Sequence, residues 1–387
     1  MTPSLGEILI LHISDTHLGS RRYNRDSREQ DVYDVFSQLI DLAIREHVRA
    51  IVHSGDLFDV YKPGNKSLKF FVDKVKLLRD KGIDFINIPG DHDTPKVRDE
   101  IYTQRLLGES LGLIKMLMGD QEPRFVEIDD GEMRIRVYGI RSMSTVFRDN
   151  LLNLLGSLKP EGERNILMLH QGFREMLPYD NAWQLEIGSL PKGFQYYACG
   201  HLHSRDVRVL PWGGILAVAG SPEIIREEEI EGWRKNGKGG YLVDLSKKEA
   251  EIHAINVDVR PQEVVRINTA SVDQDIDNIR KKLGGGRKPI LHVILEGDSS
   301  KRGYAMKRLS QLSEIAEFYR IYKDETTDSQ LREVKASGSG TISELIAEYL
   351  RKQGYNDEEV KLILEVIGKY DSDEADEILK KFAEMER

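Results

Sequence analysis

Cysteine and long apolar runs are the features that this 387-residue chain has least of. Its one cysteine, Cys199, excludes an internal disulfide and fits a reducing compartment. Because Cys199 lies within a short apolar run, we expect a small buried side chain rather than a reactive thiol. No stretch approaches the ~20 apolar residues of a membrane span, and Met1–Leu11 lacks the basic start of a secretory signal. We therefore expect a cytoplasmic protein with no membrane partner.

Negative charge is in excess, but it is concentrated in one part of the chain. The formal net charge is −9, and residues 341–387 hold 13 Asp and Glu against 7 Lys and Arg. The rest of the chain is close to neutral. The overall acidity therefore does not exclude a nucleic-acid partner, because the distribution of charge matters more than its sum.

Strand-like apolar runs alternate with helical repeats in the first half of the chain, which is typical of an α/β fold. Apolar spacing predicts helices at Gln30–His47, Ser67–Lys81 and Asp99–Leu111. Further along, the pattern becomes β-rich, with a hairpin that turns at Asp129–Glu132. We expect two mixed β-sheets sandwiched between helices.

A second unit and a tail follow this region. After Val257–Pro261 the pattern predicts a small βαβαβ domain, and Ala336–Gly340 has the composition of a flexible linker. Beyond the linker, apolar residues recur at helical spacing over a segment too short for a confident core of its own. These helices either dock back onto this chain or bind a partner protein, and the linker favours the partner. The predicted limits are 1–257, 258–330, 331–341 and 342–387.

Five of the short apolar runs end in residues that bind metals. In an open α/β sheet, ligands bind beyond the carboxyl ends of the strands, so we expect these side chains to converge. Carboxylates mixed with imidazoles suit manganese, iron or zinc better than calcium, and no thiolate is present for a structural zinc site. The seven candidate ligands are Asp15, His17, Asp56, Asp91, His170, His201 and His203.

The spacing of these residues suggests a two-metal hydrolase. On an extended segment, Asp15 and His17 would point to the same side. Asp56 follows a glycine and could bridge two cations, which together activate water for phosphate-ester hydrolysis. His92 lies outside the ligand set and could protonate the leaving oxygen, with Asp93 orienting its ring.

These motifs together resemble the calcineurin-like metallophosphoesterase superfamily, which has Asp-x-His, Gly-Asp-x-x-Asp, Gly-Asn-His-Asp, a lone His and Gly-His-x-His. Asp15–Gly19, the Lys62-Pro63 pair and Ala219–Glu223 narrow the resemblance to archaeal-type double-strand-break repair nucleases of the meiotic recombination eleven (SbcD-like) family. The resemblance covers about residues 6–255. It implies a four-layer fold, with the βαβαβ unit as a capping domain.

The resemblance also implies an activity, metals and partners. Members are manganese-dependent 3′-to-5′ exonucleases on duplex ends and endonucleases on single strands. Asp15, His17, Asp56 and His203 would hold one manganese, and Asp56, Asp91, His170 and His201 the other, with magnesium, iron or zinc as alternatives; His92 would be the catalytic histidine. The chain would form a homodimer through the helices at Ser67–Lys81 and Asp99–Leu111. Its tail would bind a Rad-fifty-type coiled-coil ATPase through Ile342, Leu345, Ile346, Tyr349, Leu350, Ile363 and Ile367.

Asp91 departs from the family pattern, which usually has Asn at this point. A carboxylate there adds negative charge, which could tighten metal binding while making the cluster less electrophilic. One alternative is therefore a scaffold that binds DNA and the ATPase through a weakened site. Another is a phosphoesterase that acts on small phosphodiesters.

We expect the protein to be associated with the nucleoid when it is bound to DNA. A nuclease must also bind the phosphate backbone of its substrate. Such contacts come from Lys, Arg, hydroxyls and amides. Two groups of basic and polar residues follow the first two ligand motifs, and we expect them to lie around the edge of the site. The alternative is that they form an ordinary solvated surface. The candidates are Arg21, Arg22, Tyr23, Asn24, Lys62, Asn65 and Lys66.

Overall fold

The computed structural model describes residues 8–97, 100–121, 124–129, 133–177, 179, 182–283, 286–327, 342–353 and 355–368. Among these, one compact unit runs to Val264 and includes the segment that ends at Leu291. The other unit takes the segment from Val265 and everything from His292 onward. The predicted linker at 331–341, the hairpin residues 130–132, the expected helix start at Asp99 and the tail beyond residue 368 lie outside the described residues.

The first unit contains two six-stranded mixed sheets. In sheet 1, β1 to β4 run parallel and β11 and β12 join antiparallel at the β1 side. Its order is β12 (Glu251–Asn256), β11 (Gly239–Asp244), β1 (Leu9–Ile13), β2 (Ala50–His53), β3 (Asp84–Asn87) and β4 (Lys115–Met116).

Sheet 2 has a parallel centre between two antiparallel edge strands. β6, β7, β8 and β10 are parallel, while β5 and β9 close the two edges. Its order is β5 (Phe125–Asp129), β6 (Arg134–Ile140), β7 (Arg164–His170), β8 (Tyr196–Gly200), β10 (Ile215–Val218) and β9 (Asp206–Val209).

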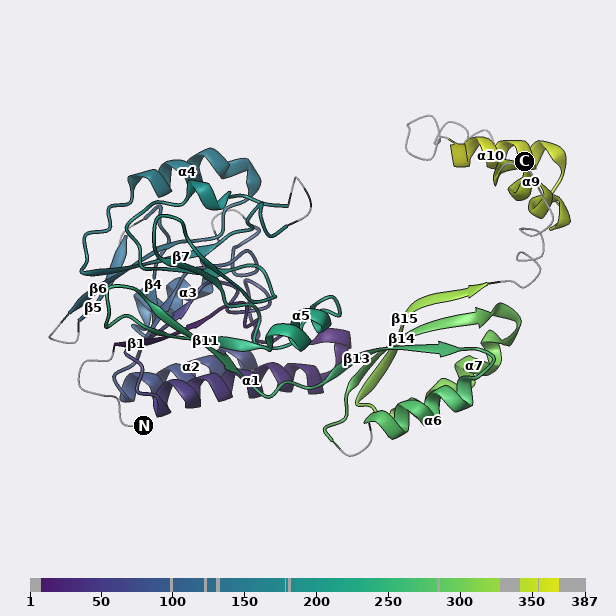
Figure 1. Cartoon of the computed structure of the whole chain (residues 1–387), viewed down its shortest axis with the longest axis horizontal. Coiled ribbons are helices and arrows are strands. Elements are labelled where there is room, and N and C mark those ends of the chain that lie inside the picture. Colours follow the sequence, from purple (N-terminus) through teal and green to yellow (C-terminus); the bar gives the residue numbers. More distant parts are fainter. Residues whose placement is uncertain are drawn as a thin grey trace. The chain divides into compact units, whose positions relative to one another are not determined.

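Helices cover the outer face of each sheet, so the unit has four layers, as the sequence predicted (Figure 1). One apolar core joins sheet 1 to α1 (Asp26–Arg45) and α2 (Asn65–Asp80). A second core fills the space between the sheets. A third joins sheet 2 to α4 (Arg148–Ser157), which buries Leu151 and Leu155. Cys199 is buried in this third core, as expected.

The helix predicted at Asp99–Leu111 is only partly formed. The described part holds the single turn α3 (Thr103–Arg105) and then the wider π-helical turn η2 (Leu106–Ser110). A Cβ on Gly108, in this turn, would stand 3.2 Å from the backbone oxygen of Ile114. The turn therefore packs closely against the segment that contains Ile114. Sequence analysis also missed α4 and α5 (Glu229–Asn236), although the leucines of α4 repeat at helical spacing. Short 3₁₀ turns are η1 (Arg22–Asn24), η3 (Thr145–Phe147) and η4 (Ile187–Ser189).

The βαβαβ order predicted for the second unit is present. Its three strands form one sheet in the order β13-β14-β15. The elements are β13 (Gln262–Asn268), α6 (Val272–Leu283), β14 (Ile290–Asp298), η5 (Ser299–Lys301), α7 (Arg302–Arg308), η6 (Leu309–Glu314) and β15 (Phe318–Thr327). The division of the chain into nuclease, capping, linker and tail domains stays a prediction.

Two further helices follow and pack against each other, α9 (Ile342–Lys352) and α10 (Asp357–Gly368). Ala347 and Val360 are buried. Tyr349 is exposed, whereas Ile346, Leu350 and Ile363 are half-buried. The side chains of Ile342, Leu345 and Ile367 lie outside the described set. None of the described helices has the length and apolar character needed to span a membrane.

Candidate metal centre

The carboxyl ends of strands from both sheets meet at one place. The segments after β1 and β2 remain paired beyond the strands, since Asp15 N donates to Gly55 O at 2.9 Å and His17 N to Asp56 O at 3.0 Å. From sheet 2, His170 ends β7 and its Nδ1 donates to Ser54 O at 2.7 Å. The two sheets therefore hold these loops against each other and bring the candidate ligands together.

Glycines allow this close approach. A Cβ on Gly55 would stand 2.2 Å from His170 Nδ1, and Gly55 has a φ of +96°. A Cβ on Gly90 would stand 2.0 Å from Asp56 Oδ1. The glycines of Gly55-Asp56 and Gly90-Asp91 are thus required by the packing of the ligands themselves.

The expectation of an extended Asp15–His17 segment is wrong. Asp15, His17, Asp56 and His201 have φ values of 50°, 44°, 54° and 82°, in the left-handed region that L-residues rarely adopt. Such conformations cost of order 1–3 kcal/mol each and persist where the surrounding structure enforces them. The ligands converge because of these turns rather than because of strand alternation.

All seven predicted ligands fall in four groups of three residues, and within each group the donor atoms lie within 4.8 Å of one another. One of these groups also contains His92, beside His17 and Asp56, although the sequence placed His92 outside the ligand set. One group joins Asp15, His17 and His203, and another joins Asp91, His170 and His201. Asp56 lies between them, with its Oδ2 3.8 Å from His17 Nε2 and 3.5 Å from His170 Nε2. The geometry is that of two adjacent ligand sets with one carboxylate in reach of both.

The hydrogen bonds of the histidines fit bound cations. His203 Nδ1 donates to Glu229 Oε1 at 2.7 Å, which leaves its Nε2 lone pair facing His17 Nε2 at 3.2 Å. His170 Nδ1 is occupied by Ser54 O, so its Nε2 faces Asp91 Oδ1 at 3.0 Å. Lone pairs that face each other or a carboxylate repel unless a positive charge lies between them. These residues therefore fit divalent metal ions.

The pKa shifts indicate the same preference for positive charge. Burial alone would lower the pKa of His17, but Asp59, Asp56 and Asp15 outweigh it and raise the pKa to about 9. Burial likewise opposes the charged form of His170, yet Asp56 and Asp91 raise its pKa well above the usual value. The surrounding carboxylates thus stabilise a cation at both ends of the cluster.

The predicted pairing of Asp93 with the His92 ring is wrong. His92 Nδ1 donates to the backbone oxygen of Asp59 at 2.7 Å. Asp93 is buried, and its carboxylate accepts the backbone N–H groups of Leu57, Phe58 and Gly90 at 3.0–3.1 Å. Asp93 therefore fixes the two ligand loops, whereas a backbone carbonyl orients His92. Sequence spacing could not distinguish these partners because the carbonyl comes from another loop.

Glu229 is the site residue that sequence analysis missed. Besides His203, its carboxylate accepts hydrogen bonds from Ser221 Oγ at 2.9 Å and from the buried Lys238 ammonium. Burial would raise the pKa of Glu229, but Lys238 and His203 outweigh it and hold the pKa well below its usual range. The sequence spacing between His203 and Glu229 does not predict their contact, because it is the position of α5 that brings Glu229 to His203.

Two buried histidines outside the candidate ligand set, His12 and His53, support the site from behind. Tyr196 OH donates to His12 Nδ1 at 2.8 Å, His12 Nε2 donates to Ser54 Oγ at 3.1 Å, and Ser54 Oγ donates to Ala198 O at 2.9 Å. This chain of bonds links sheet 1 to sheet 2 directly beneath His170. His53 is held in a similar way, by Thr16 and Asn87.

A cleft of about 950 Å³ opens beside Asp56, Asp91 and His92, and none of the seven predicted DNA contacts lines it. Arg21 pairs with Asp26 at 2.7 Å, Lys66 with Glu29 at 2.8 Å, and Lys62 with Glu100. Arg22 Nε donates to Ile225 O at 3.0 Å. Tyr23 and Asn24 form η1 with positive φ values, and Asn65 is exposed at the start of α2. The cations that do line the cleft are Arg205, Arg208, Arg226 and Lys235, none of which was predicted.

Comparisons with known proteins show the family of this chain. Residues 8–205 match the family described as calcineurin-like phosphoesterase. The chain is 47% identical over 383 residues to the DNA double-strand break repair protein Mre11 of Saccharolobus solfataricus, covering 97% of this chain and 98% of that protein. Mre11 of Sulfurisphaera tokodaii is 47% identical over 94% of each chain, and Mre11 of Methanocaldococcus jannaschii is 37% identical over 67% of this chain.

The class that the fold and the site define is therefore a calcineurin-like metallophosphoesterase. Within that class, the chain belongs to the Mre11 family. The resemblance inferred from the motifs is confirmed, over nearly the whole chain.

Proposed function

We propose that this chain is a metal-dependent DNA nuclease of double-strand-break repair, hydrolysing phosphodiesters with two manganese ions per chain. The observation that carries the proposal is the convergence of seven carboxylate and imidazole ligands from two sheets in a member of the Mre11 family. Bound divalent cations would polarise the phosphodiester and lower the pKa of an attacking water. A 3′-to-5′ direction on duplex ends and endonuclease activity on single strands belong to the same proposal.

The roles of the protein groups follow from their contacts. Asp56 reaches both ligand sets, so it is the bridging candidate. The Asp59 carbonyl accepts a hydrogen bond from His92 Nδ1, so Nε2 is the nitrogen left for the substrate, and when the ring carries a second proton there, that proton can pass to the leaving oxygen. Glu229 keeps a proton on His203 Nδ1 and so directs the lone pair of Nε2 into the site.

Homodimer formation is proposed at the segment that follows the His92 loop. Val97, Ile101, Leu106 and Leu111 are 50–64% exposed, and Leu77 of α2 is 40% exposed. Several exposed apolar side chains within one short segment are typical of a protein interface. Replacing Ile101 and Leu106 by Glu should therefore give a monomer in analytical ultracentrifugation, whereas a Val146→Glu control should not.

Binding of a Rad-fifty-type coiled-coil ATPase is proposed for α9 and α10, which carry apolar residues at helical spacing on a helix pair. Removing residues 337–387 should abolish binding to the ATPase and leave metal-dependent cleavage intact. Loss of folding or of cleavage in the shortened chain would show instead that the tail belongs to the core of this chain. We also propose that the protein is associated with the nucleoid when it is bound to DNA.

The decisive experiment is degradation of end-labelled duplex DNA with manganese, magnesium or chelator, using His201→Ala as the blank. We expect manganese-dependent shortening that the variant lacks. A chain that binds two manganese ions but does not cut would favour the scaffold alternative. Cleavage of a small chromogenic diester without cleavage of DNA would favour the small-substrate phosphoesterase.

A further inference from the structure

One cleft contains both the candidate metal centre and cations to which no role has been assigned. Its volume is about 950 Å³, within the range of ligand sites in proteins. Four of the candidate ligands lie in its lining: Asp56, Asp91, His201 and His203. Arg226 and Lys235 line the same cleft, so a phosphodiester bound at the metal centre would share one open space with these two cations.

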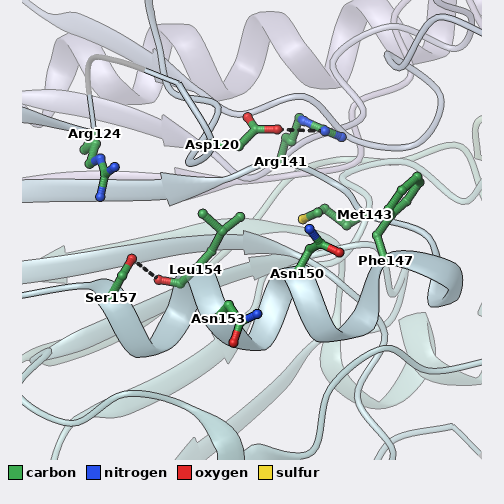
Figure 2. Close-up of a pocket in the computed structure, with 9 residues that line it drawn as sticks. All are labelled: Asp120, Arg124, Arg141, Met143, Phe147, Asn150, Asn153, Leu154 and Ser157. Carbon is green, nitrogen blue, oxygen red and sulfur yellow. Dashed lines mark hydrogen bonds and ion pairs between the residues drawn. The ribbon is translucent and has the colours of Figure 1, made fainter.

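A second cavity, of about 510 Å³, lies beside α4 and offers a comparison (Figure 2). Among the described residues, its lining includes none of the candidate ligands. Figure 2 shows Arg141 beside Asp120 in this cavity, and Arg141 Nη2 donates to that carboxylate at 2.9 Å. The cleft is therefore the cavity that joins cations to the metal centre.

The side chains of Arg226 and Lys235 are available to a ligand. Both are exposed, and among the described residues neither side chain takes part in a hydrogen bond or an ion pair. The other two arginines of the cleft are occupied. Arg205 is buried and donates to backbone oxygens, and Arg208 pairs with Asp206 at 3.0 Å.

Most of the other carboxylates that line the cleft are engaged as well. Glu229 pairs with the buried Lys238, and Glu175 Oε1 accepts from the backbone N–H of Ile187 at 2.9 Å. Glu228 is exposed, and within the described part of the chain its side chain has no such partner. Apart from the metal ligands, two cations and one carboxylate of the described lining thus remain unpaired, an excess that favours an anion.

The backbone of Arg226 is fixed by the group that directs a candidate metal ligand. Arg226 N donates to Glu229 Oε1 at 3.0 Å, and the same oxygen accepts from His203 Nδ1 at 2.7 Å. The preceding residue is held too, since Arg22 Nε donates to Ile225 O at 3.0 Å. Arg226 therefore begins from a backbone held close to His203, and its long side chain can reach a phosphate beside the metal centre.

Lys235 continues the positive charge along α5. It follows Glu228 by seven residues, and both line the cleft, because residues seven apart share one face of a helix. At 1.5 Å per residue, Lys235 stands ~9 Å beyond Glu229 along the helix axis. The two cations are thus spaced along the cleft, as the phosphates of one strand are.

We propose that Arg226 binds the phosphate next to the one being cleaved, and that Lys235 binds the same strand further along α5. Arginine suits the first role because its guanidinium makes two parallel hydrogen bonds to a phosphate. The proposal rests on the proposed nuclease function, and it makes the cleft select a polynucleotide over an isolated phosphodiester, which has no second phosphate. Both residues contribute to substrate binding rather than to the chemical step.

The first test compares two substrates in manganese. Arg226→Gln should lower kcat/KM on an end-labelled oligonucleotide about tenfold more than on bis-p-nitrophenyl phosphate, which has a single phosphate. The loss should lie in KM rather than in kcat. Arg234→Gln is the matched control, because Arg234 is on α5, pairs with Glu263 and lies outside the cleft lining. It should cleave both substrates as the unmodified chain does.

A second test uses the sign of the charge. Anisotropy measures the binding of a fluorescein-labelled single-stranded oligonucleotide in chelator over a range of salt, so cleavage does not contribute. Arg226→Gln and Lys235→Gln should each weaken binding and reduce the slope of log K against log salt by about 0.7. Arg226→Lys should keep the slope, and Glu228→Gln, which removes the unpaired carboxylate, should strengthen binding. Weaker binding by Glu228→Gln would contradict the proposal.

The outcomes separate this proposal from the proposed function. If the unmodified chain cleaves DNA and Arg226→Gln binds and cleaves it equally well, the phosphate site is wrong and the nuclease stands. If Arg226→Gln loses activity on both substrates to the same extent, Arg226 only supports Glu229 and His203, and the phosphate site is wrong as well. If the unmodified chain never cleaves DNA, the nuclease proposal fails, and the salt slopes in chelator still decide whether Arg226 and Lys235 bind phosphates.

Discussion

At the scale of single residues, Asp91 is the feature that most affects the charge of the metal centre. Its Oδ1 lies 3.0 Å from His170 Nε2 and 3.2 Å from His201 Nδ1, within reach of one ligand set. With Asp15 and Asp56 it brings three carboxylates to the cluster. A neutral amide at this position would keep an oxygen donor while removing one negative charge, so we expect Asp91 to set the balance between metal affinity and electrophilicity.

Asp91→Asn should weaken manganese binding and raise the rate of DNA cleavage at saturating manganese. One fewer negative charge reduces the attraction for the cation, and the cluster then attracts an anionic phosphodiester more strongly. Calorimetric titration of manganese and cleavage of end-labelled duplex at several manganese concentrations measure the two effects. Asp80→Asn, at the exposed end of α2, is the control. Unchanged manganese affinity would show that the charge of Asp91 does not contribute to metal binding.

Glu229→Gln should weaken divalent metal binding by about 10- to 100-fold, because the carboxylate that directs His203 is lost. The buried Lys238 also loses its counter-charge in this variant. A double variant, Glu229→Gln with Lys238→Met, separates the two effects. If metal affinity recovers in the double variant, the unpaired ammonium caused the loss. If the affinity stays low, the orientation of His203 is what Glu229 provides.

At the scale of elements, the segment before α1 and the start of α2 carry cations beside the first ligand loop. A Cβ on Gly19 would stand 3.0 Å from Ser67 Oγ, so the loop that leads to Arg21 lies against the start of α2. Arg21 and Lys66 are 50% and 62% exposed in surface ion pairs. Such pairs contribute little stability and are readily exchanged for phosphate. Arg22 differs, because its Nε is used to hold Ile225 O.

Arg21→Ala combined with Lys66→Ala should weaken DNA binding and reduce the slope of log K against log salt by about 2, since each phosphate contact contributes roughly 0.9. The measurement is duplex binding in chelator from low to moderate salt. Lys69→Ala, on the same helix and 78% exposed, is the matched control. A slope equal to that of the unmodified chain would remove these residues from the DNA-binding surface.

At the scale of the whole molecule, a buried ion cluster fixes the segments that lead toward the second unit. Asp31 of α1 is 1% exposed and accepts from Arg28 at 2.6 Å, from Arg260 at 2.7 and 2.9 Å, and from Arg287. Arg28 also pairs with Glu223, in the segment that leads to Glu229. The connecting chain and the support of the metal centre thus share one network in the first unit.

Asp31→Asn should destabilise the protein by about 3–5 kcal/mol, because three guanidiniums lose a buried counter-charge. Urea unfolding followed by circular dichroism measures the change. Asp34→Asn is the control, since that carboxylate is 45% exposed and 3.6 Å from Arg287; it should change stability by less than about 0.5 kcal/mol. Equal effects of the two substitutions would contradict the network.

The sequence by itself determined the family and the main strands and helices, and it predicted the seven candidate ligands, because metal chemistry needs particular residue types at strand ends. The sequence also determined which faces of α1 and α2 are buried, because apolar residues on a buried helix face recur at the helical period. The sequence could not predict that Glu229 contacts His203 or that the Asp59 carbonyl contacts His92. Only the tertiary structure decided these partners, together with the left-handed turns at Asp15 and His17, because each depends on segments distant in the chain meeting in space.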